Sequence, residues 1–238
     1  MNAGNTFDAS RIRALIFDLD GTLADTIGAI RDAINDTMQK YGYPEKTYAQ
    51  VRDAIGNGAR MLVRRCMPTG EAEDEKKVDR VLASYDLAYA RTYLHTRACY
   101  EGVREAVAEL SARGYRIAVL SNKQDAYVKG LVSQLFGDGE IELAVGQTAL
   151  PIKPNPTVPR LLAHQLCVGL HECALIGDSD VDVLTAKNAA MVSVGCSWGY
   201  RGRSELERAG ADAVIDRPDQ LLELFLSVPP PVEEFLDS

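Results

Sequence analysis

Two aspartates, Asp18 and Asp20, stand at the end of an apolar run that covers residues 11–17. Side chains at positions i and i+2 of an extended chain point to the same side, so both carboxyl groups can face one pocket. A free carboxyl group has a pKa near ~4, and we therefore expect Asp18 to be ionised at neutral pH. An ionised carboxylate can act as a nucleophile, while a second one can protonate a leaving alkoxide and later activate water. The pair predicts covalent catalysis by Asp18, with Asp20 as general acid and base.

Six more polar residues follow later apolar segments of the chain: Ser121, Asn122, Lys123, Lys153, Asp178 and Asp182. In open α/β sheets, ligands bind at the edge where the carboxyl ends of the parallel strands meet. Lys153 would supply a positive charge for a phosphate group there, and Ser121 would supply a hydroxyl donor. Each residue alone has an ordinary explanation, such as helix capping for Ser121. The set as a whole indicates a site for phosphoryl transfer.

The carboxylates of this set favour a metal ion. Three or four carboxylates at one point repel each other, and without a cation some of them would be protonated. Mg²⁺ prefers oxygen ligands and usually keeps several waters together with a substrate phosphate. A cation between an anionic nucleophile and an anionic phosphate also removes their mutual repulsion. We therefore expect Mg²⁺ as the cofactor.

Strand-like and helix-like segments alternate after residue 100, which is typical of a parallel sheet between two layers of helices. We expect strands at residues 11–17, 116–120, 141–145, 174–176, 191–194 and 213–215. We expect helices at residues 102–113, 126–136, 157–166, 181–190, 204–209 and 218–226. The predicted fold class is α/β, with a Rossmann-like parallel-sheet core and helices on both faces.

Residues 26–95 show helical periodicity and no convincing strand pattern. Apolar residues share a helical face, as in Ile27, Ile30, Ile34 and Met38. A crossover needs only about a dozen residues, so an insertion of this length indicates a separate unit. We divide the chain into an α/β core of residues 1–25 and 96–238 and an inserted helical cap domain of residues 26–95. Because the insertion leaves the strand edge just after Asp20, we expect the cap to act as a lid.

The composition limits the class of partner. The 238 residues carry a net charge of −8, which argues against nucleic-acid binding because phosphate backbones attract positive charge. No run of about 18 apolar residues exists, so no membrane partner is expected. Five cysteines without a Cys-x-x-Cys pair, and a polar N-terminus, indicate a reduced, cytoplasmic protein. The expected partner is a small phosphorylated metabolite. The oligomeric state stays open, and the tail around residues 229–231 is expected to be frayed.

The chain resembles the haloacid dehalogenase superfamily, whose four ordered motifs are similar to Asp18-Leu-Asp20-Gly21-Thr22-Leu23, Ser121-Asn122, Lys153-Pro154 and Gly177-Asp178-Ser179-x-x-Asp182. The resemblance covers about residues 11–224. It implies that Asp18 is the nucleophile and a magnesium ligand, that Asp20 is the acid/base and lends its backbone carbonyl to the metal, and that Asp178 is the third ligand. It also implies phosphate binding by Ser121 and Lys153 with Asn122 in support, and an orienting role for Asp182 toward Lys153 or a metal water.

Within the superfamily the chain looks most like phosphoglycolate phosphatases, on the segments at residues 18–26, 55–63 and 198–200. We expect substrate specificity to lie on the cap surface that faces Asp18, with Asn57, Gly58 and Arg60 as the candidate residues. The guanidinium of Arg60 could pair bidentately with a substrate carboxylate.

Three alternatives remain open: a sugar phosphomutase similar to β-phosphoglucomutase, a pyrophosphatase, and a non-catalytic binding module on the same fold. A mutase would return the phosphoryl group to its substrate, so release of inorganic phosphate distinguishes a phosphatase from a mutase. The intact set of Asp18, Asp20, Lys153 and Asp178 argues against the binding module. Asp180 adds a carboxylate to the last motif, and the sequence assigns it no role.

Overall fold

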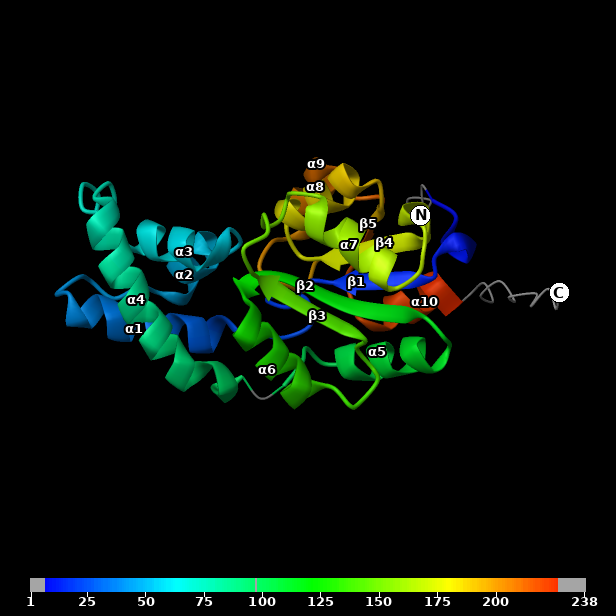
Figure 1. The fold of residues 1–238 in the computed structure, drawn as a ribbon, viewed down its shortest axis with the longest axis horizontal. Helices are drawn as coiled ribbons and strands as arrows, with labels where there is room; N and C mark the ends of the chain where they lie inside the picture. The colour runs from blue at the N-terminus through cyan, green and yellow to red at the C-terminus, as the bar shows by residue number, and fades with distance from the viewer. Residues whose placement is uncertain (1–6, 97, 227–238) are drawn as a thin grey trace.

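The computed structural model describes residues 7–96 and 98–226. Six parallel strands within these ranges form one sheet in the order β3-β2-β1-β4-β5-β6 (Figure 1). Their bounds are β1 Ala14–Phe17, β2 Arg116–Gln124, β3 Leu143–Gln147, β4 Cys173–Gly177, β5 Val192–Cys196 and β6 Ala213–Ile215. The order reverses between β1 and β4, which places a topological switch point beside the end of β1. The α/β fold class predicted from the sequence is confirmed.

Helices cover both faces of the sheet because the strand side chains alternate between two apolar layers. Leu15 and Phe17 of β1 pack in one layer, whereas Ala14 and Ile16 pack in the other. The first layer also contains α5 Val103–Ala112, α6 Asp125–Leu135 and α10 Asp219–Leu226. The second contains α7 Thr157–Gln165 and α8 Asp180–Ala189. The remaining elements of the core are α9 Arg203–Ala209 and the short 3-10 helices η1 Ala9–Arg11 and η3 Leu170–Glu172.

The strand β2 is longer than its sequence pattern predicts. The apolar run ends at Leu120, but the extended chain continues to Gln124, so Ser121 and Asn122 lie within the strand. Pairing with β3 is irregular over this extension, where Leu120 faces Val145 and Gln124 faces Gln147. A polar sequence at a strand end resembles a loop, because only the packing of its neighbours reveals the extended conformation.

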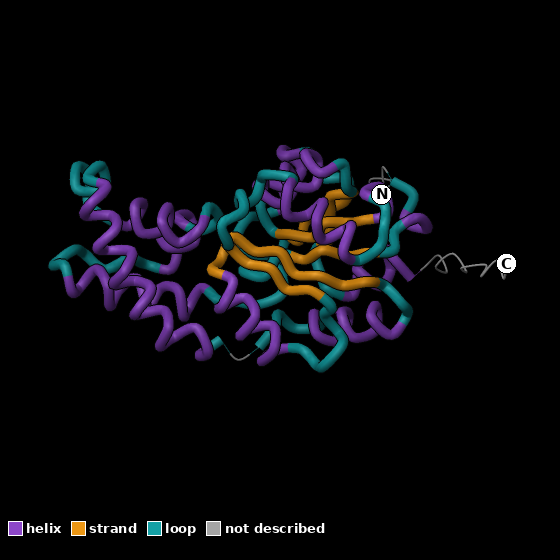
Figure 2. The backbone as a smooth tube through the Cα atoms, viewed as in Figure 1, coloured by secondary structure: helices purple, strands orange, loops and turns teal. Residues whose placement is uncertain are grey.

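Four helices follow β1 and form an apolar cluster of their own at one end of the molecule (Figure 2). They are α1 Ile27–Lys40, α2 Tyr48–Ala54, α3 Gly58–Cys66 and α4 Glu75–Thr92, and the 3-10 helix η2 Tyr93–His95 follows them. Local signals define several ends: Thr47 and Gln50 form a capping box at α2, and Asp74 caps α4. Buried side chains at the centre of the cluster include Ile34, Met38, Val51, Val63, Val81 and Tyr89.

The two connections between these helices and the sheet lie side by side. Ala24, before α1, forms β-bridges with Asp20 and with Cys99, and the backbone N–H of Tyr100 donates to the Leu23 carbonyl at 3.1 Å. The helical unit is therefore tethered next to Asp20. In the described ranges, none of the helices combines the length and apolar character needed to cross a bilayer. The expectation of a frayed tail concerns residues 227–238, which lie outside the described ones.

Replacement of a buried leucine in the core should destabilise the protein far more than replacement of an exposed one. Leu110 of α5 is fully buried, whereas Leu87 of α4 is 65% exposed. Leu110→Ala should lower the free energy of unfolding by about 2–5 kcal/mol through lost burial and a residual cavity. The matched variant Leu87→Ala should change it by less than about 0.5 kcal/mol. Urea unfolding measures both values, and equal losses would contradict the described packing.

Candidate active site

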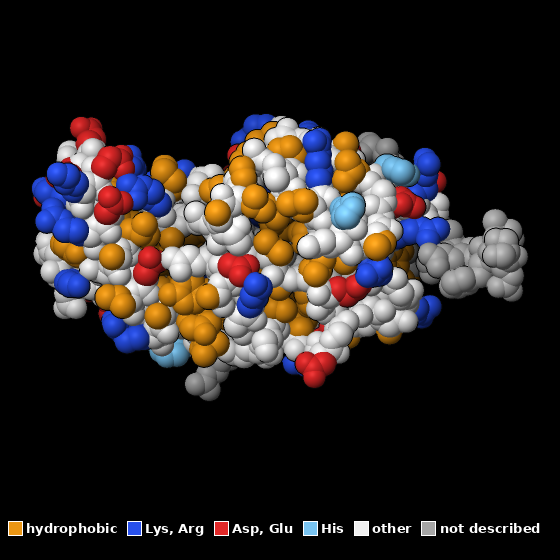
Figure 3. Space-filling model, viewed as in Figure 1, with side chains coloured by type: hydrophobic (Ala, Val, Ile, Leu, Met, Phe, Trp, Pro, Cys, Tyr) orange, Lys and Arg blue, Asp and Glu red, His pale blue; other side chains and the backbone are white. Residues whose placement is uncertain are grey.

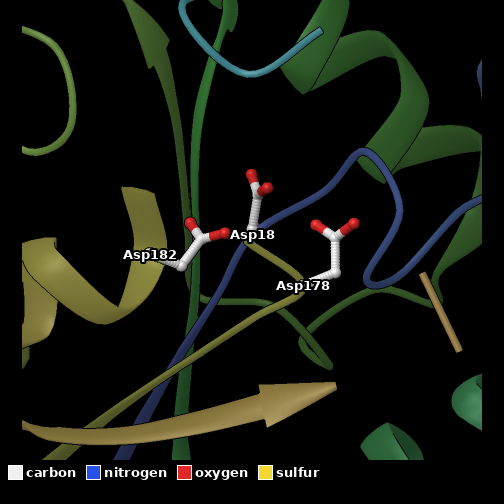
Figure 4. Close-up of side chains that lie close together, drawn as sticks. All are labelled: Asp18, Asp178 and Asp182. Carbon is white, nitrogen blue, oxygen red and sulfur yellow. The ribbon is translucent and has the colours of Figure 1, made fainter. Parts of the chain in front are cut away.

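Three carboxylates meet at the carboxyl edge of the sheet. Asp18 follows β1, Asp178 follows the neighbouring strand β4, and Asp182 lies in the first turn of α8. One oxygen from each lies within 4.8 Å of the others, and Figure 4 shows the three carboxyl groups close together on one side of the chain. All three residues are at least nine-tenths buried. The sequence places all three carboxylates at this edge of the sheet, and the structure brings them together.

Burial makes this cluster electrostatically unfavourable as it stands. Removal from water raises the pKa of Asp18 to about 7, although the positive charge of Lys153 opposes the shift. Burial likewise raises the pKa of Asp178 well above its usual value, and the charges of Asp182 and Asp18 add to the effect. A divalent cation would favour the ionised forms, and hard cations such as Mg²⁺ prefer oxygen donors of this kind. The donor set therefore fits a divalent metal.

Lys153 neutralises part of the cluster. Its Nζ lies 2.8 Å from Asp18 Oδ1 and 2.6 Å from Asp182 Oδ1, and the side chain is 3% exposed. The other oxygen of Asp182 accepts hydrogen bonds from the Ser179 hydroxyl at 2.6 Å and the Ser179 N–H at 3.2 Å. Both oxygens of Asp182 thus have protein partners, and the side chain holds the Lys153 ammonium beside Asp18.

Asp178 is fixed by the chain that follows β5. Its Oδ2 accepts the backbone N–H of Tyr200 at 2.6 Å, and its Oδ1 lies 3.4 Å from the Thr22 hydroxyl donor. Gly21 permits this approach in two ways. Its φ of +86° favours glycine, and a Cβ there would lie 2.4 Å from Asp178 Oδ2. The position of the Asp178 carboxylate therefore requires a glycine at position 21.

Asp20 lines the same cavity but does not belong to the group of three carboxylates. Its Oδ1 accepts a hydrogen bond from the Thr26 hydroxyl at 2.5 Å and lies 2.9 Å from Lys123 Nζ. The Thr26 hydroxyl also lies 3.0 Å from the phenol oxygen of Tyr200. These contacts separate the acid/base candidate from the nucleophile candidate. The sequence places Lys123 at this edge of the sheet with Ser121 and Asn122 but assigns it no role, and its contact with Asp20 comes from the structure.

The second motif supplies one hydroxyl to the cavity and one structural amide. Ser121 lines the cavity and is 4% exposed. Asn122 Nδ2 donates to the carbonyls of Lys153 at 3.1 Å and of Gly56 at 3.0 Å, and its Oδ1 accepts the Lys153 N–H at 2.9 Å. The Asn122 amide is thus committed to backbone groups, and it joins the Lys153 loop to the loop before α3.

The site opens into a cavity of about 100 Å³ between the sheet edge and the four helices. The core contributes Asp18, Asp20, Ser121, Lys123, Lys153 and Arg201 to its walls, and the helical unit contributes Ile30, Asn57, Gly58, Leu62, Tyr85 and Tyr89. Two of the three expected cap residues, Asn57 and Gly58, therefore reach the cavity. Arg201 was not anticipated, although it follows directly on the 198–200 segment that the sequence singled out.

Arg60, the third expected cap residue, lies elsewhere. Its guanidinium binds Glu75 and Asp79 of α4 and does not line the cavity. Helix periodicity explains the difference, since Gly58 and Arg60 are two positions apart and so point in different directions. Figure 3 shows basic and acidic side chains gathered together at the outer end of the helical unit. The structure places Arg60 in ion pairs on the surface, outside the cavity that Asp18 lines.

Known proteins match this chain over most of its length. The sequence pattern of the Haloacid dehalogenase-like hydrolase family matches residues 15–196. A protein named phosphoglycolate phosphatase from Vibrio parahaemolyticus is 32% identical over 90% of this chain and 96% of its own. A protein of the same name from Colwellia psychrerythraea is 31% identical over 87% of this chain and 94% of its own.

A solved structure agrees with these sequence matches. The crystal structure of a predicted phosphoglycolate phosphatase from Haemophilus somnus superposes with a TM-score of 0.82 at 26% identity. It covers 90% of this chain and 98% of that one. The resemblance stated from the four motifs is confirmed. This chain belongs to the haloacid dehalogenase-like hydrolase family, and its place within that family is among the phosphatases.

Proposed function

We propose that this enzyme is a magnesium-dependent phosphatase of small phosphomonoesters, with 2-phosphoglycolate as its substrate. The observation that carries the proposal is the meeting of Asp18, Asp178 and Lys153 at one buried point beside a small cavity. The names of the relatives support the choice of substrate. The second candidate, a sugar phosphomutase, has no separate observation in its favour.

The residues divide the reaction into two steps. A carboxylate oxygen of Asp18 forms a bond to phosphorus while the ester P–O bond breaks, and Asp20 gives a proton to the leaving alkoxide. Asp20 then takes a proton from water, which attacks the phospho-aspartate and releases inorganic phosphate. Ser121 and Lys153 are placed to hold the phosphoryl oxygens during both steps. Asp182 keeps Lys153 in position through its 2.6 Å contact.

Magnesium would be held by the carboxylates of Asp18 and Asp178 and by the backbone carbonyl of Asp20. When bound, it supplies positive charge between the anionic nucleophile and the anionic phosphate. The raised pKa of Asp18 in the protein alone supports this assignment, because the cation would favour the ionised nucleophile. Asp182 would not bind the metal, because its two carboxylate oxygens contact Lys153 and Ser179.

The helical segment at residues 26–95 is proposed to be a cap domain on a core of residues 1–25 and 96–238. Its loop at Gly56 to Gly58 already contacts the core, since Asn122 donates to the Gly56 carbonyl and Arg201 donates to the Ile55 carbonyl. A cap so close to Asp18 excludes water during transfer and leaves no room for a folded protein substrate. A small cytoplasmic metabolite is the substrate class that fits, and Asn57 and Gly58 are placed to contact it.

Removal of the nucleophile should abolish turnover. Asp18→Asn keeps the shape of the side chain but removes the charge, so kcat for 2-phosphoglycolate should fall at least about 10³-fold. Phosphate release is measured on a panel of phosphoglycolate, sugar phosphates, pyrophosphate, nucleotides and an aryl phosphate. Equal rates for Asp18→Asn and the wild type would indicate a contaminant and revive the binding-module hypothesis. Turnover of sugar phosphates without phosphate release would favour the mutase.

Loss of Asp178 should weaken metal binding and activity together. Asp178→Ala should raise the magnesium concentration for half-maximal activity at least about tenfold, because a carboxylate ligand is lost. The control is Asp36→Ala, which removes a carboxylate that is 57% exposed on α1 and should leave that concentration unchanged. Magnesium titration of activity measures both. Full activity of the wild type in excess chelator would refute the metal assignment.

Arg60→Ala should leave substrate affinity nearly unchanged. Because Arg60 is engaged with Glu75 and Asp79 outside the cavity, KM for phosphoglycolate should stay within about twofold of the wild type, as for other surface substitutions. Steady-state kinetics with phosphoglycolate and with an aryl phosphate measure this. A KM increase of tenfold or more for phosphoglycolate alone would restore Arg60 as a specificity residue and contradict the described geometry.

A further inference from the structure

We propose that Lys123 binds a carboxylate on the leaving group of the substrate and so selects phosphomonoesters with a carboxylate close to the ester oxygen. The inference rests on the proposed function, because it takes Asp20 as the residue that protonates the leaving group. It concerns a different part of the cavity from the phosphoryl site at Asp18 and Lys153.

Three of the described residues that line the cavity are cationic: Lys123, Lys153 and Arg201. Lys153 is held between Asp18 and Asp182 and belongs to the phosphoryl end. The guanidinium of Arg201 faces the cap loop and donates to the Ile55 carbonyl at 3.2 Å, and its Nε lies 3.5 Å from Glu205. A second anionic group on the substrate therefore has Lys123 as its available partner.

The Lys123 ammonium is buried at the boundary between core and cap. Its side chain is 7% exposed, and its Nζ lies 2.9 Å from Asp20 Oδ1 and 4.7 Å from the centre of the Tyr89 ring. An ammonium has three N–H donors, and the carboxylate and the ring face do not use all of them. A buried cation that is partly satisfied gains strongly from a further anionic acceptor, because water does not compete for it.

The place of Lys123 relative to Asp20 defines which substrate atom it meets. A general acid works within about 2.6–3.2 Å of the oxygen that it protonates. Lys123 Nζ is 2.9 Å from a carboxyl oxygen of that same acid. The ammonium is therefore separated from the ester oxygen by the Asp20 carboxyl group, a span of about two hydrogen-bond lengths. In 2-phosphoglycolate the carboxylate is joined to the carbon that carries this oxygen. The carboxylate can therefore reach Lys123 while the ester oxygen stays at Asp20.

The cap restricts the rest of the leaving group. The helical unit lines the cavity with Ile30, Leu62, Tyr85 and Tyr89, and the ring of Tyr89 lies against the Lys123 ammonium. Tyr85 and Tyr89 stack with ring centres 5.6 Å apart, so this wall is continuous along α4. A neutral small leaving group would meet the same wall without the ionic contact. The geometry thus favours acidic leaving groups over neutral ones of the same size.

The test compares two substrates that differ by this carboxylate, 2-phosphoglycolate and ethyl phosphate. The wild type should prefer phosphoglycolate in kcat/KM. Lys123→Met removes the charge and keeps most of the side-chain length, and it should reduce that preference about tenfold to a hundredfold, which corresponds to one hydrogen bond to a charged group. Lys123→Gln serves as the second variant if the methionine variant does not fold, as judged by thermal unfolding.

The matched control is Lys129→Met. Lys129 also pairs with an aspartate, Asp125, at 2.7 Å, but its side chain is 62% exposed on α6 and outside the cavity. This variant should keep the wild-type preference. Lys123→Arg should keep part of it, because the positive charge remains.

The outcomes separate the inference from the proposed function. If Lys123→Met lowers kcat/KM for both substrates by the same factor, the inference is overturned, because Lys123 would then only orient Asp20. Equal kcat/KM of the wild type for phosphoglycolate and ethyl phosphate would overturn it as well and leave the phosphatase activity intact. Absence of phosphate release from every phosphate ester in the panel would instead overturn the proposed function, and the inference with it.

Discussion

The burial of negative charge at the end of β1 and β4 is the constraint on which the rest of the site depends. Asp18, Asp178 and Asp182 are removed from water within a few ångströms of one another. Such groups are tolerated only with cations and hydrogen-bond donors at fixed places. Lys153, the Ser179 hydroxyl and the Tyr200 N–H meet part of this need, and a divalent metal would meet the rest.

The same constraint couples the site to the proposed cap. Asn122 fixes both the Lys153 backbone and the Gly56 carbonyl, so one side chain links the position of the cation to the position of the loop that closes the cavity. A second contact lies on α4, where Gln124 donates to Asp86 at 2.7 Å and the Tyr127 hydroxyl donates to the Asp86 carbonyl at 3.1 Å. The polar extension of β2 and the helix after it therefore provide a docking surface as well as part of the site.

The cavity holds two separate pairs of a lysine and an aspartate, one for each of the two proposed chemical steps. Lys153 contacts Asp18 at the proposed phosphoryl end, and Lys123 contacts Asp20 at the proposed leaving-group end. Each carboxylate that would react is thus paired with its own ammonium. Asp20 therefore has different partners from Asp18, although it is only two residues away. Acid/base chemistry and nucleophilic attack can then proceed from neighbouring residues with different surroundings.

The sequence by itself determined the alternation of strands and helices, the strand end that carries Asp18 and Asp20, and the order of the four motifs. These features depend on local periodicity and on turn residues such as Gly21, which act over a few positions of the chain. Only the tertiary structure decided that Lys123 reaches Asp20 and that Arg60 turns to Glu75 and Asp79. Long charged side chains can reach several partners, and which partner they meet depends on segments brought together by packing.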